Sequence, residues 1–179
     1  MTGLITAAEA LAIHAHAGQR YGELPYTYHL ESVASHVRAA TRVPASIYDQ
    51  EVIAAAWLHD AIEDTELTRD GISQQVSPRV ARIVDAVTDG TGSNRAERKL
   101  RPYRLIPTVP GAVLVKVADR LANLDHCLRT GNTRLMRMYV DEHGSFCDML
   151  RGADRGPGAV GIWSELDRTV ERCRMMVRR

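Results

Sequence analysis

The feature that most constrains this chain is the segment 54–65, which reads AAAWLHDAIEDT. On a helix, residues four apart lie almost in line, so His59 stands beside Glu63 and Asp60 stands beside Asp64. Alanine, leucine and isoleucine fill the opposite face, as in a helix that buries one side. Carboxylates this close repel one another, and burying them without a cation is strongly unfavourable. The segment therefore predicts a continuous, buried helix that carries part of a metal site.

The composition favours helices throughout the chain. Only 5% of the 179 residues are aromatic, and alanine is abundant, which favours helices over a β-sandwich or barrel. We therefore predict an all-α helical bundle with a single domain over residues 1–179, a core at about 7–150 and a C-terminal helix at about 162–178. The formal net charge is +1, so no overall field attracts nucleic acid or a membrane.

The cysteines and the N-terminus indicate a cytoplasmic location. Cys127, Cys147 and Cys173 are far apart and lack the close spacing of a metal-binding cysteine pair. We interpret them as free thiols in a reducing compartment. Residues 1–13 lack the basic start and long apolar run of a signal peptide, and no apolar run approaches the length of a membrane span.

Periodicity, caps and breakers predict the limits of the helices. Thr6 and Glu9 form a capping-box pair in the first helix, Val43-Pro44 ends the second, and Pro102 limits the basic segment 95–105 to a short or kinked helix. The predicted helices are 6–17, 30–41, 46 or 49 to about 64, 68 or 70 to 75, 78–87, 112–129, 132 or 133 to 150, and 162–178. Residues 19–29, 88–94 and 151–161 are predicted loops.

Polar residues on core-like segments point to one site, and they are His29, His59, Asp60 and Asp119. Two imidazoles and two carboxylates suit Mn²⁺, Fe²⁺, Zn²⁺ or Mg²⁺. Such an ion lowers the pKa of water from about 15.7 to roughly 7 and neutralises a phosphoryl oxygen. Glu63 and Asp64, one turn further on, are placed to orient or deprotonate a water.

Several motifs of the chain strengthen this interpretation. They are His16-Ala17-Gly18-Gln19-Arg20, Pro25-Tyr26 followed by His29, HDAIEDT from His59, Val87-Thr88, and KVADRLAN from Lys116. Over about residues 7–129 the chain resembles the HD superfamily of metal-dependent phosphohydrolases and, within it, the hydrolase domain of RelA/SpoT-type alarmone enzymes. Its length is similar to that of the stand-alone small alarmone hydrolases, which lack the synthetase domain.

The resemblance implies an all-α HD-domain bundle that uses Mn²⁺ and removes the 3′-diphosphate from guanosine tetra- and pentaphosphate. The products are GDP or GTP and pyrophosphate. The residues that match the metal ligands by position are His29, His59, Asp60 and Asp119. Those that match the pair handling the attacking water are Glu63 and Asp64. Asn123 matches a nucleotide contact, and Arg20 matches a basic residue near the base and phosphates.

Departures from the family pattern fall on the nucleotide-binding side. Tyr21 replaces a common lysine, Leu30 replaces the customary proline, His126 stands where a hydroxyl residue is common, and the loop to His29 is short. Two alternatives therefore stay open. One is an HD phosphohydrolase that acts on another nucleotide or phosphate ester, and the other is a non-catalytic, nucleotide-sensing HD module.

The remaining candidates each have two interpretations. Lys116 either contacts a phosphate or extends to solvent, and Tyr26 or Tyr28 either packs or stacks on a base. The basic segment 95–104 either clamps an anionic substrate or forms a solvated face. His16 is predicted to pack rather than to bind. No nucleic-acid partner is expected, and a homo-oligomer stays open.

Overall fold

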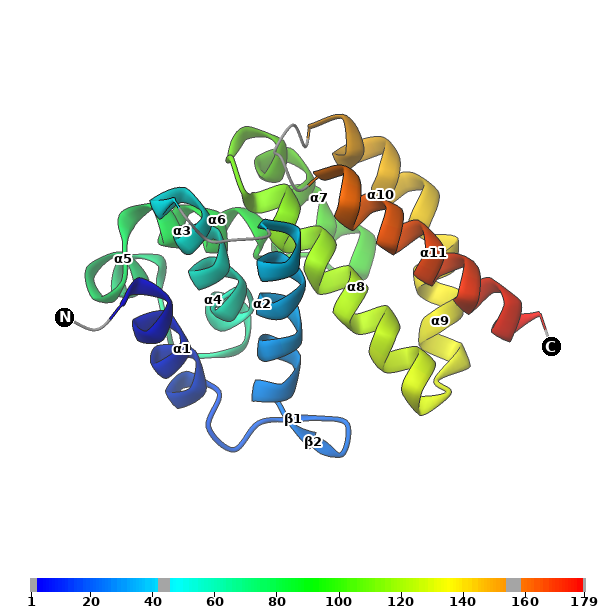
Figure 1. The fold of residues 1–179 in the computed structure, drawn as a ribbon, viewed down its shortest axis with the longest axis horizontal. Coiled ribbons are helices and arrows are strands. Elements are labelled where there is room, and N and C mark those ends of the chain that lie inside the picture. Colours follow the sequence, from blue (N-terminus) through cyan, green and yellow to red (C-terminus); the bar gives the residue numbers. More distant parts are fainter. Residues whose placement is uncertain (1–2, 42–45, 154–158, 179) are drawn as a thin grey trace.

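The computed structural model describes residues 3–41, 46–153 and 159–178, and these residues are predominantly helical (Figure 1). The α-helices are α1 Leu4–Ala15, α2 Thr27–Thr41, α3 Ile47–Trp57, α4 Ala61–Asp64, α5 Arg69–Gln75, α6 Pro78–Val87, α7 Arg95–Leu105, α8 Ala112–Thr130, α9 Thr133–Asp141, α10 His143–Leu150 and α11 Ala159–Val177. The other elements are the 3-10 turns η1 Ile106–Thr108 and η2 Arg151–Ala153 and the strands β1 Arg20–Tyr21 and β2 Leu24–Pro25. The all-α prediction is confirmed. None of these helices is both long enough and apolar enough to cross a membrane.

Helices α2, α3 and α8 form the centre of the bundle. α2 packs against both α3 and α8, α1 covers α3, and α11 lies along α8 and α9 (Figure 1). The sequence of α8 explains its central position, because Val117 and Leu121 on its apolar side are fully buried. The polar stripe of the same helix, formed by Lys116, Asp119 and Asn123, lines a cleft instead.

The helix predicted around the HD motif is interrupted at the motif itself. α3 ends at Trp57, residues 58–60 form a turn, and α4 begins at Ala61. Backbone hydrogen bonds between residues three apart replace the usual bonds between residues four apart, which tightens the chain here. The prediction of one continuous helix is therefore wrong. The turn directs His59 and Asp60 towards α2 and α8.

Two further helix limits differ from the predictions. α1 has Gly3 at its N-cap without a side-chain hydrogen bond, so the predicted capping box of Thr6 and Glu9 is wrong. The helix predicted up to residue 150 is divided into α9 and α10 at Glu142. The Glu142 carboxylate accepts a hydrogen bond from Arg95 Nε of α7 at 2.7 Å, and this long-range pair lies at the break.

The predicted loop at 19–29 contains a short hairpin. β1 and β2 pair antiparallel, with Arg20 opposite Pro25. The hairpin leads directly into α2, whose start at Thr27 places His29 in the first helical turn rather than before it.

The C-terminal helix α11 begins at Ala159, three residues before its predicted start and inside the predicted loop 151–161, whereas other limits agree with the sequence. α5 and α6 occupy the two segments predicted at 68 or 70 to 75 and at 78–87. α7 forms over 11 residues with Pro102 inside it. The predicted stop at Val43-Pro44, and residues 154–158 of the predicted loop 151–161, lie outside the described residues.

Candidate active site

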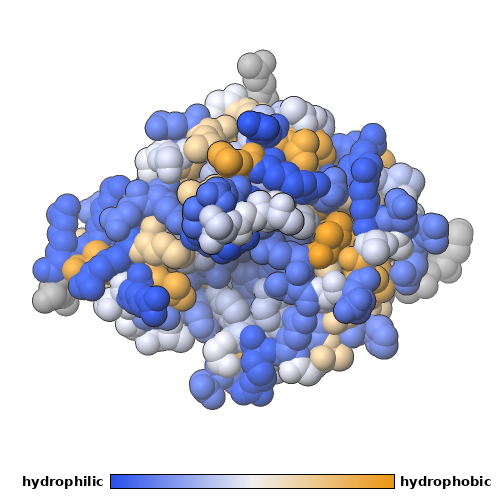
Figure 2. All heavy atoms as spheres, turned by 180° about the vertical axis from the view of Figure 1, so that it is seen from behind, coloured by the Kyte–Doolittle hydropathy of each residue, from blue (hydrophilic) through white to orange (hydrophobic). Residues whose placement is uncertain are grey.

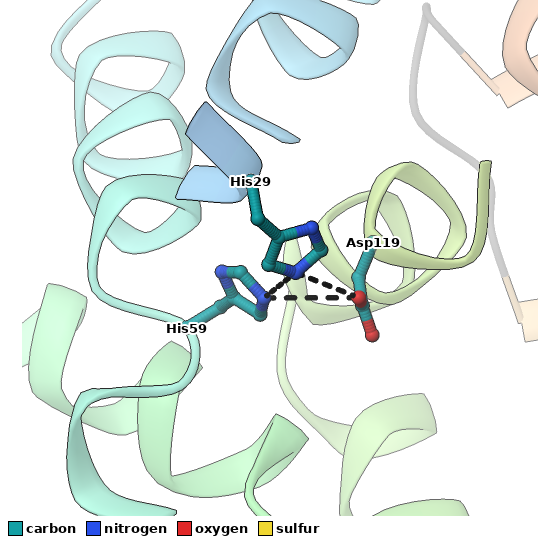
Figure 3. Close-up of side chains that lie close together, drawn as sticks. All are labelled: His29, His59 and Asp119. Atoms are coloured by element: carbon teal, nitrogen blue, oxygen red, sulfur yellow. Dashed lines mark hydrogen bonds and ion pairs between the residues drawn. The ribbon is translucent and has the colours of Figure 1, made fainter. Parts of the chain in front are cut away.

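Two histidines and an aspartate meet where α2, the turn after α3, and α8 come together (Figure 3). His29 and His59 are buried, and their Nε2 atoms are 3.2 Å apart. Asp119 Oδ1 lies 3.4 Å from His29 Nε2 and 3.7 Å from His59 Nε2. The three side chains therefore direct their donor atoms at one common space.

Asp60 adds a fourth donor to this cluster. Its Oδ2 lies 3.0 Å from His59 Nε2 and 3.5 Å from His29 Nε2. Neighbouring ligands at about 2.1 Å from an ion stand about 3.0 Å apart in an octahedron and about 3.4 Å apart in a tetrahedron. The four residues expected as ligands are thus gathered at separations that fit a divalent ion.

A hydrogen bond from His59 Nδ1 to the backbone leaves His59 Nε2, which faces the cluster, free to bind a cation. His59 Nδ1 lies 2.9 Å from the carbonyl oxygen of Ala56. A carbonyl only accepts, so we assign the proton to Nδ1 and a lone pair to Nε2, which is the form that binds a metal. The buried Nδ1 of His29 has no hydrogen-bond partner within the described part of the chain. The donor set fits a divalent metal ion.

The charges around the cluster also favour a cation. Burial alone lowers the pKa of His29, but the neighbouring Asp119 and Asp60 outweigh it and raise the pKa to about 9. Burial raises the pKa of Asp119, but Lys116 and both histidines outweigh it and hold the pKa well below its usual range. Positive charge at this point is therefore strongly stabilised.

Asp119 is held in place by two neighbours on α8. Lys116 Nζ lies 3.2 Å from its Oδ2, with 11% of the lysine side chain exposed, so Lys116 does not extend to solvent. Asn123 Nδ2 donates to Asp119 Oδ1 at 2.6 Å. The Tyr21 hydroxyl in turn donates to Asn123 Oδ1 at 2.8 Å. A chain of hydrogen bonds thus runs from the hairpin to the cluster.

Replacing Asn123 with alanine is expected to lower the affinity for Mn²⁺ about 10- to 100-fold, the usual effect of removing a hydrogen bond to a metal ligand. The affinity is measured by titrating metal-free protein and following free Mn²⁺ by electron paramagnetic resonance. Tyr21→Phe is the matched control, because it keeps Asn123 and removes only the outer bond, and it should lose less. Unchanged affinity in Asn123→Ala would show that Asp119 needs no such support.

Two departures from the family pattern, Tyr21 and His126, contact each other at the rim of the cluster. Their ring centroids are 4.3 Å apart, and the Tyr21 ring also stacks on His29 with centroids 4.7 Å apart. Burial raises the pKa of Tyr21 far above its usual value, so the hydroxyl remains a hydrogen-bond donor. Tyr21 is therefore a site residue that the motifs identify only as a departure.

Glu63 and Asp64 stand beside the cluster on α4, and both are open to solvent. Glu63 Oε2 accepts a hydrogen bond from the backbone N–H of Asp89 at 3.1 Å. Asp64 Oδ2 lies 3.1 Å from the Tyr26 hydroxyl. Partial burial raises the pKa of both carboxyl groups, which brings them closer to the range useful for proton transfer.

The side chains of Tyr26 and Arg20, both expected to contact a nucleotide, form hydrogen bonds to other groups of the protein. The Tyr26 hydroxyl donates to Asp60 Oδ2 at 2.6 Å, and its ring stacks on the buried His16 at 4.8 Å, which covers one ring face. His16 thus packs, as predicted. The Arg20 guanidinium donates to the carbonyl oxygen of Glu23 within the hairpin. Arg20 is not among the described residues that line the cleft.

The cluster opens into a cleft lined mostly by polar side chains. Figure 2 shows the rear face hollowed near its centre, with mainly hydrophilic side chains around the hollow. Besides the residues expected at the site, the cleft is lined by Tyr21, Arg95, Lys99, Tyr103, Arg120, Tyr139 and Phe146. The sequence gives a signal for Arg120, which adjoins Asp119 in the KVADRLAN motif, but none for Tyr103, Tyr139 or Phe146.

The basic segment 95–104 divides between the cleft and the surface. Lys99 lines the cleft, and its Nζ lies 2.8 Å from Asp89 Oδ1. Arg95 also lines the cleft. Arg101 pairs with Asp85 at 2.6 Å, and Arg104 is exposed. The segment therefore has residues both in the cleft and at the surface, and substrate binding by Lys99 or Arg95 stays a prediction.

The fold of this protein is a helical bundle, and its histidines and aspartates lie together at the base of a polar cleft. These two features are typical of metal-binding helical domains. The chain belongs to the HD domain family, whose model matches residues 8–141. It is 39% identical over 135 residues to guanosine-3′,5′-bis(diphosphate) 3′-pyrophosphohydrolase MESH1 of Mus musculus, covering 72% of this chain and 73% of that protein. It is also 33% identical over 115 residues to the Aquifex aeolicus enzyme of the same activity, covering 62% of this chain and 16% of that protein.

The fold has a counterpart among solved structures. A structure described as a metazoan ortholog of SpoT that hydrolyzes ppGpp and plays a role in starvation responses superposes with a TM-score of 0.75. The two chains are 26% identical, and 96% of each is covered. These findings confirm the expected membership of the HD superfamily and the likeness to its alarmone hydrolases.

Proposed function

We propose that this protein is a metal-dependent pyrophosphohydrolase that removes the 3′-diphosphate from guanosine 3′,5′-bis(diphosphate) and from its pentaphosphate analogue. Water adds to phosphorus, the bond from phosphorus to the ribose 3′ oxygen breaks, and GDP or GTP and pyrophosphate leave. The observation that carries this proposal is the cluster of His29, His59 and Asp119, joined by Asp60, at the base of a cleft lined by carboxylates and lysines. The activity named for its relatives supports the same substrate.

The ligands that would hold the ion are His29, His59, Asp60 and Asp119, and we propose that the ion is Mn²⁺. A bound divalent ion lowers the pKa of water to roughly 7 and neutralises charge on a phosphoryl oxygen. Imidazole and carboxylate donors are compatible with Mn²⁺. Because Lys116 and Asn123 fix Asp119, little reorganisation is needed when the ion binds.

In this proposal Glu63 and Asp64 handle the protons of the reaction. Glu63 is oriented by the Asp89 N–H and Asp64 by the Tyr26 hydroxyl. One carboxylate accepts a proton from the attacking water, and a carboxyl group then delivers a proton to the leaving ribose oxygen. Burial raises the pKa of both carboxyl groups, which favours the protonated form in whichever of them acts as the acid.

The basic residues of the cleft would bind the phosphates. Lys99, Lys116 and Arg95 line the cleft together with the cluster, and charge-assisted hydrogen bonds to phosphate are stronger than neutral ones. Asn123 and Tyr26 line it too, so both can contact the nucleotide. For Arg20 to do so, its guanidinium would have to leave the carbonyl oxygen of Glu23.

Replacing Lys99 with methionine is expected to raise KM about 10- to 100-fold with a smaller change in kcat. Hydrogen bonds to charged groups contribute about 1.5–3 kcal/mol, and 1.4 kcal/mol corresponds to about tenfold. Steady-state kinetics with the bis(diphosphate) measure both constants. Arg104→Met on the exposed side of the same helix is the control. An unaltered KM in Lys99→Met would remove Lys99 from the phosphate site.

The direct test of the substrate is a panel of nucleotides. Protein loaded with Mn²⁺ is given both guanosine alarmones, GDP, GMP and other nucleoside monophosphates, and pyrophosphate and phosphate are quantified. The proposal predicts pyrophosphate from the two alarmones only. Phosphate released from monophosphates alone would favour a different HD phosphohydrolase. Tight binding of an alarmone without turnover would favour a sensing module.

A further inference from the structure

A second group of metal-binding side chains lies outside the cleft, between α10 and α11. His143 is buried, and Cys147 and Asp167 are half-buried. His143 Nε2 lies 3.2 Å from Asp167 Oδ1 and 3.6 Å from Cys147 Sγ. None of the three is among the described residues that line the active-site cleft. Their closeness to one another is therefore not a consequence of the cluster in the cleft.

The sequence places two of these donors together before any tertiary contact forms. His143 and Cys147 are four residues apart on α10, so their side chains share one face of the helix. α11 packs beside them and supplies Asp167 as a third donor from a second helix. The spacing between the cysteines gives no sign of this group, because the partners of Cys147 are a histidine and an aspartate.

Two of the separations in this group are close to those of a zinc site. With Zn–S near 2.3 Å and Zn–N and Zn–O near 2.0–2.1 Å, a tetrahedral ion separates sulfur from nitrogen by about 3.6 Å and nitrogen from oxygen by about 3.3 Å. The corresponding separations here are 3.6 Å and 3.2 Å. Cys147 Sγ also lies 3.8 Å from His143 Nδ1, so it sits beside the ring, and a change of side-chain rotamer at Cys147 or His143 is needed before one ion can bind all three donors.

A cation already occupies the edge of this group. Arg151 Nη2 lies 3.3 Å from Cys147 Sγ and 2.5 Å from Asp167 Oδ1. Its guanidinium also lies over the Trp163 ring, 4.8 Å from the centroid. The Arg151 side chain is 43% exposed, so it has room to swing into solvent. Arg151 shows that the donors favour positive charge, and it would compete with an incoming ion.

We propose that His143, Cys147 and Asp167 form a second metal site, which takes Zn²⁺ or another borderline to soft divalent cation when Arg151 is displaced. The thiolate separates this site chemically from the cluster of imidazoles and carboxylates in the cleft, because thiolate selects softer ions than Mn²⁺. The site would join α10 to α11 next to Phe146, a residue of the cleft wall. The proposal does not depend on the substrate of the cleft.

Cobalt titration of the full-length, metal-free protein tests the proposal, because Co²⁺ replaces Zn²⁺ and gives a thiolate-to-metal charge-transfer band only when a cysteine binds it. The parent protein is expected to develop this band and to lose it on addition of Zn²⁺. Cobalt in the cleft cluster gives no such band, since that cluster holds no sulfur. Absence of the band in the parent would overturn the proposal.

Variants assign the site to these residues. Cys147→Ser and His143→Gln should each lose the band, and Cys127→Ala, which changes a buried cysteine elsewhere, should keep it. Arg151→Ala should bind Co²⁺ more tightly than the parent, because the competing guanidinium is removed. This gain cannot arise from misfolding, and circular dichroism checks the fold of the other variants. A band that persists in Cys147→Ser, or no gain in Arg151→Ala, would contradict the proposal.

Discussion

Replacing Asp119 with alanine is expected to abolish stoichiometric Mn²⁺ binding and to lower the rate of pyrophosphate release by at least about 10³-fold. Losing a single electrostatic donor in an active site typically lowers kcat about 10²- to 10³-fold, and loss of the ion removes a larger charge. Asp119 Oδ1 faces both histidines, at 3.4 Å and 3.7 Å, so the cluster keeps no equivalent donor from α8. Metal analysis after gel filtration and a pyrophosphate assay measure the two effects.

The same substitution is expected to destabilise the fold, because Lys116 loses its carboxylate partner at 3.2 Å. Removing one member of a buried ion pair costs about 3–5 kcal/mol. Asp119→Asn keeps the shape of the side chain and removes its charge. A thermal unfolding curve of each variant then separates loss of metal binding from loss of folding stability. Asp125→Ala, on the same helix but outside the cleft lining, is the matched control. Full activity in folded Asp119→Asn would contradict the assignment of this ligand.

Replacing Glu63 with glutamine is expected to lower kcat about 10²- to 10⁴-fold, the usual contribution of a general acid or base. Glutamine retains the size of the side chain and an oxygen that can accept the hydrogen bond from the Asp89 N–H. It cannot take a proton from water, so the loss falls on kcat and leaves Mn²⁺ binding unchanged. Single-turnover kinetics with Mn²⁺-loaded protein separate the chemical step from substrate binding.

The control for this experiment is Glu66→Gln, an exposed glutamate of the same segment, which should retain the parent rate. The double variant Glu63→Gln/Asp64→Asn tests whether the two carboxyl groups act as a unit. If they do, the double variant is little slower than the worse single variant. A parental kcat in Glu63→Gln would assign the proton transfer elsewhere and would leave Asp64 as the remaining candidate on α4.

Local sequence signals predicted the helices well wherever a cap or breaker acts within a few residues. Ser46, predicted as one possible start, accepts a hydrogen bond from the Asp49 N–H at 3.1 Å and begins α3. The two breaks that were not predicted lie at sites of distant contacts. The turn at 58–60 faces side chains from α2 and α8, and Glu142 pairs with Arg95 across 47 positions of the chain. Helical periodicity carries no information about such partners.

The four residues proposed as metal ligands could be picked out in the sequence because histidine and aspartate stand out on apolar segments and match family motifs in order. The aromatic residues Tyr103, Tyr139 and Phe146, which line the cleft, could not be predicted in this way. Tyr139 and Phe146 resemble core residues in the sequence, and in the structure they line the cleft from α9 and α10, on either side of the division at Glu142. Arg120 is buried, and its Nη2 donates to the Tyr139 carbonyl oxygen at 2.6 Å. The single-domain organisation, the cytoplasmic location and a homo-oligomer remain predictions.

Hydrolysis in ¹⁸O-labelled water tests most directly whether water attacks the 3′-diphosphate at a metal-dependent site. Mn²⁺-loaded protein is incubated with guanosine 3′,5′-bis(diphosphate), and the products are weighed by mass spectrometry. We expect one labelled oxygen in pyrophosphate, none in GDP, and no reaction after the metal is chelated. Label in GDP, or release of single phosphates in place of pyrophosphate, would contradict this mechanism.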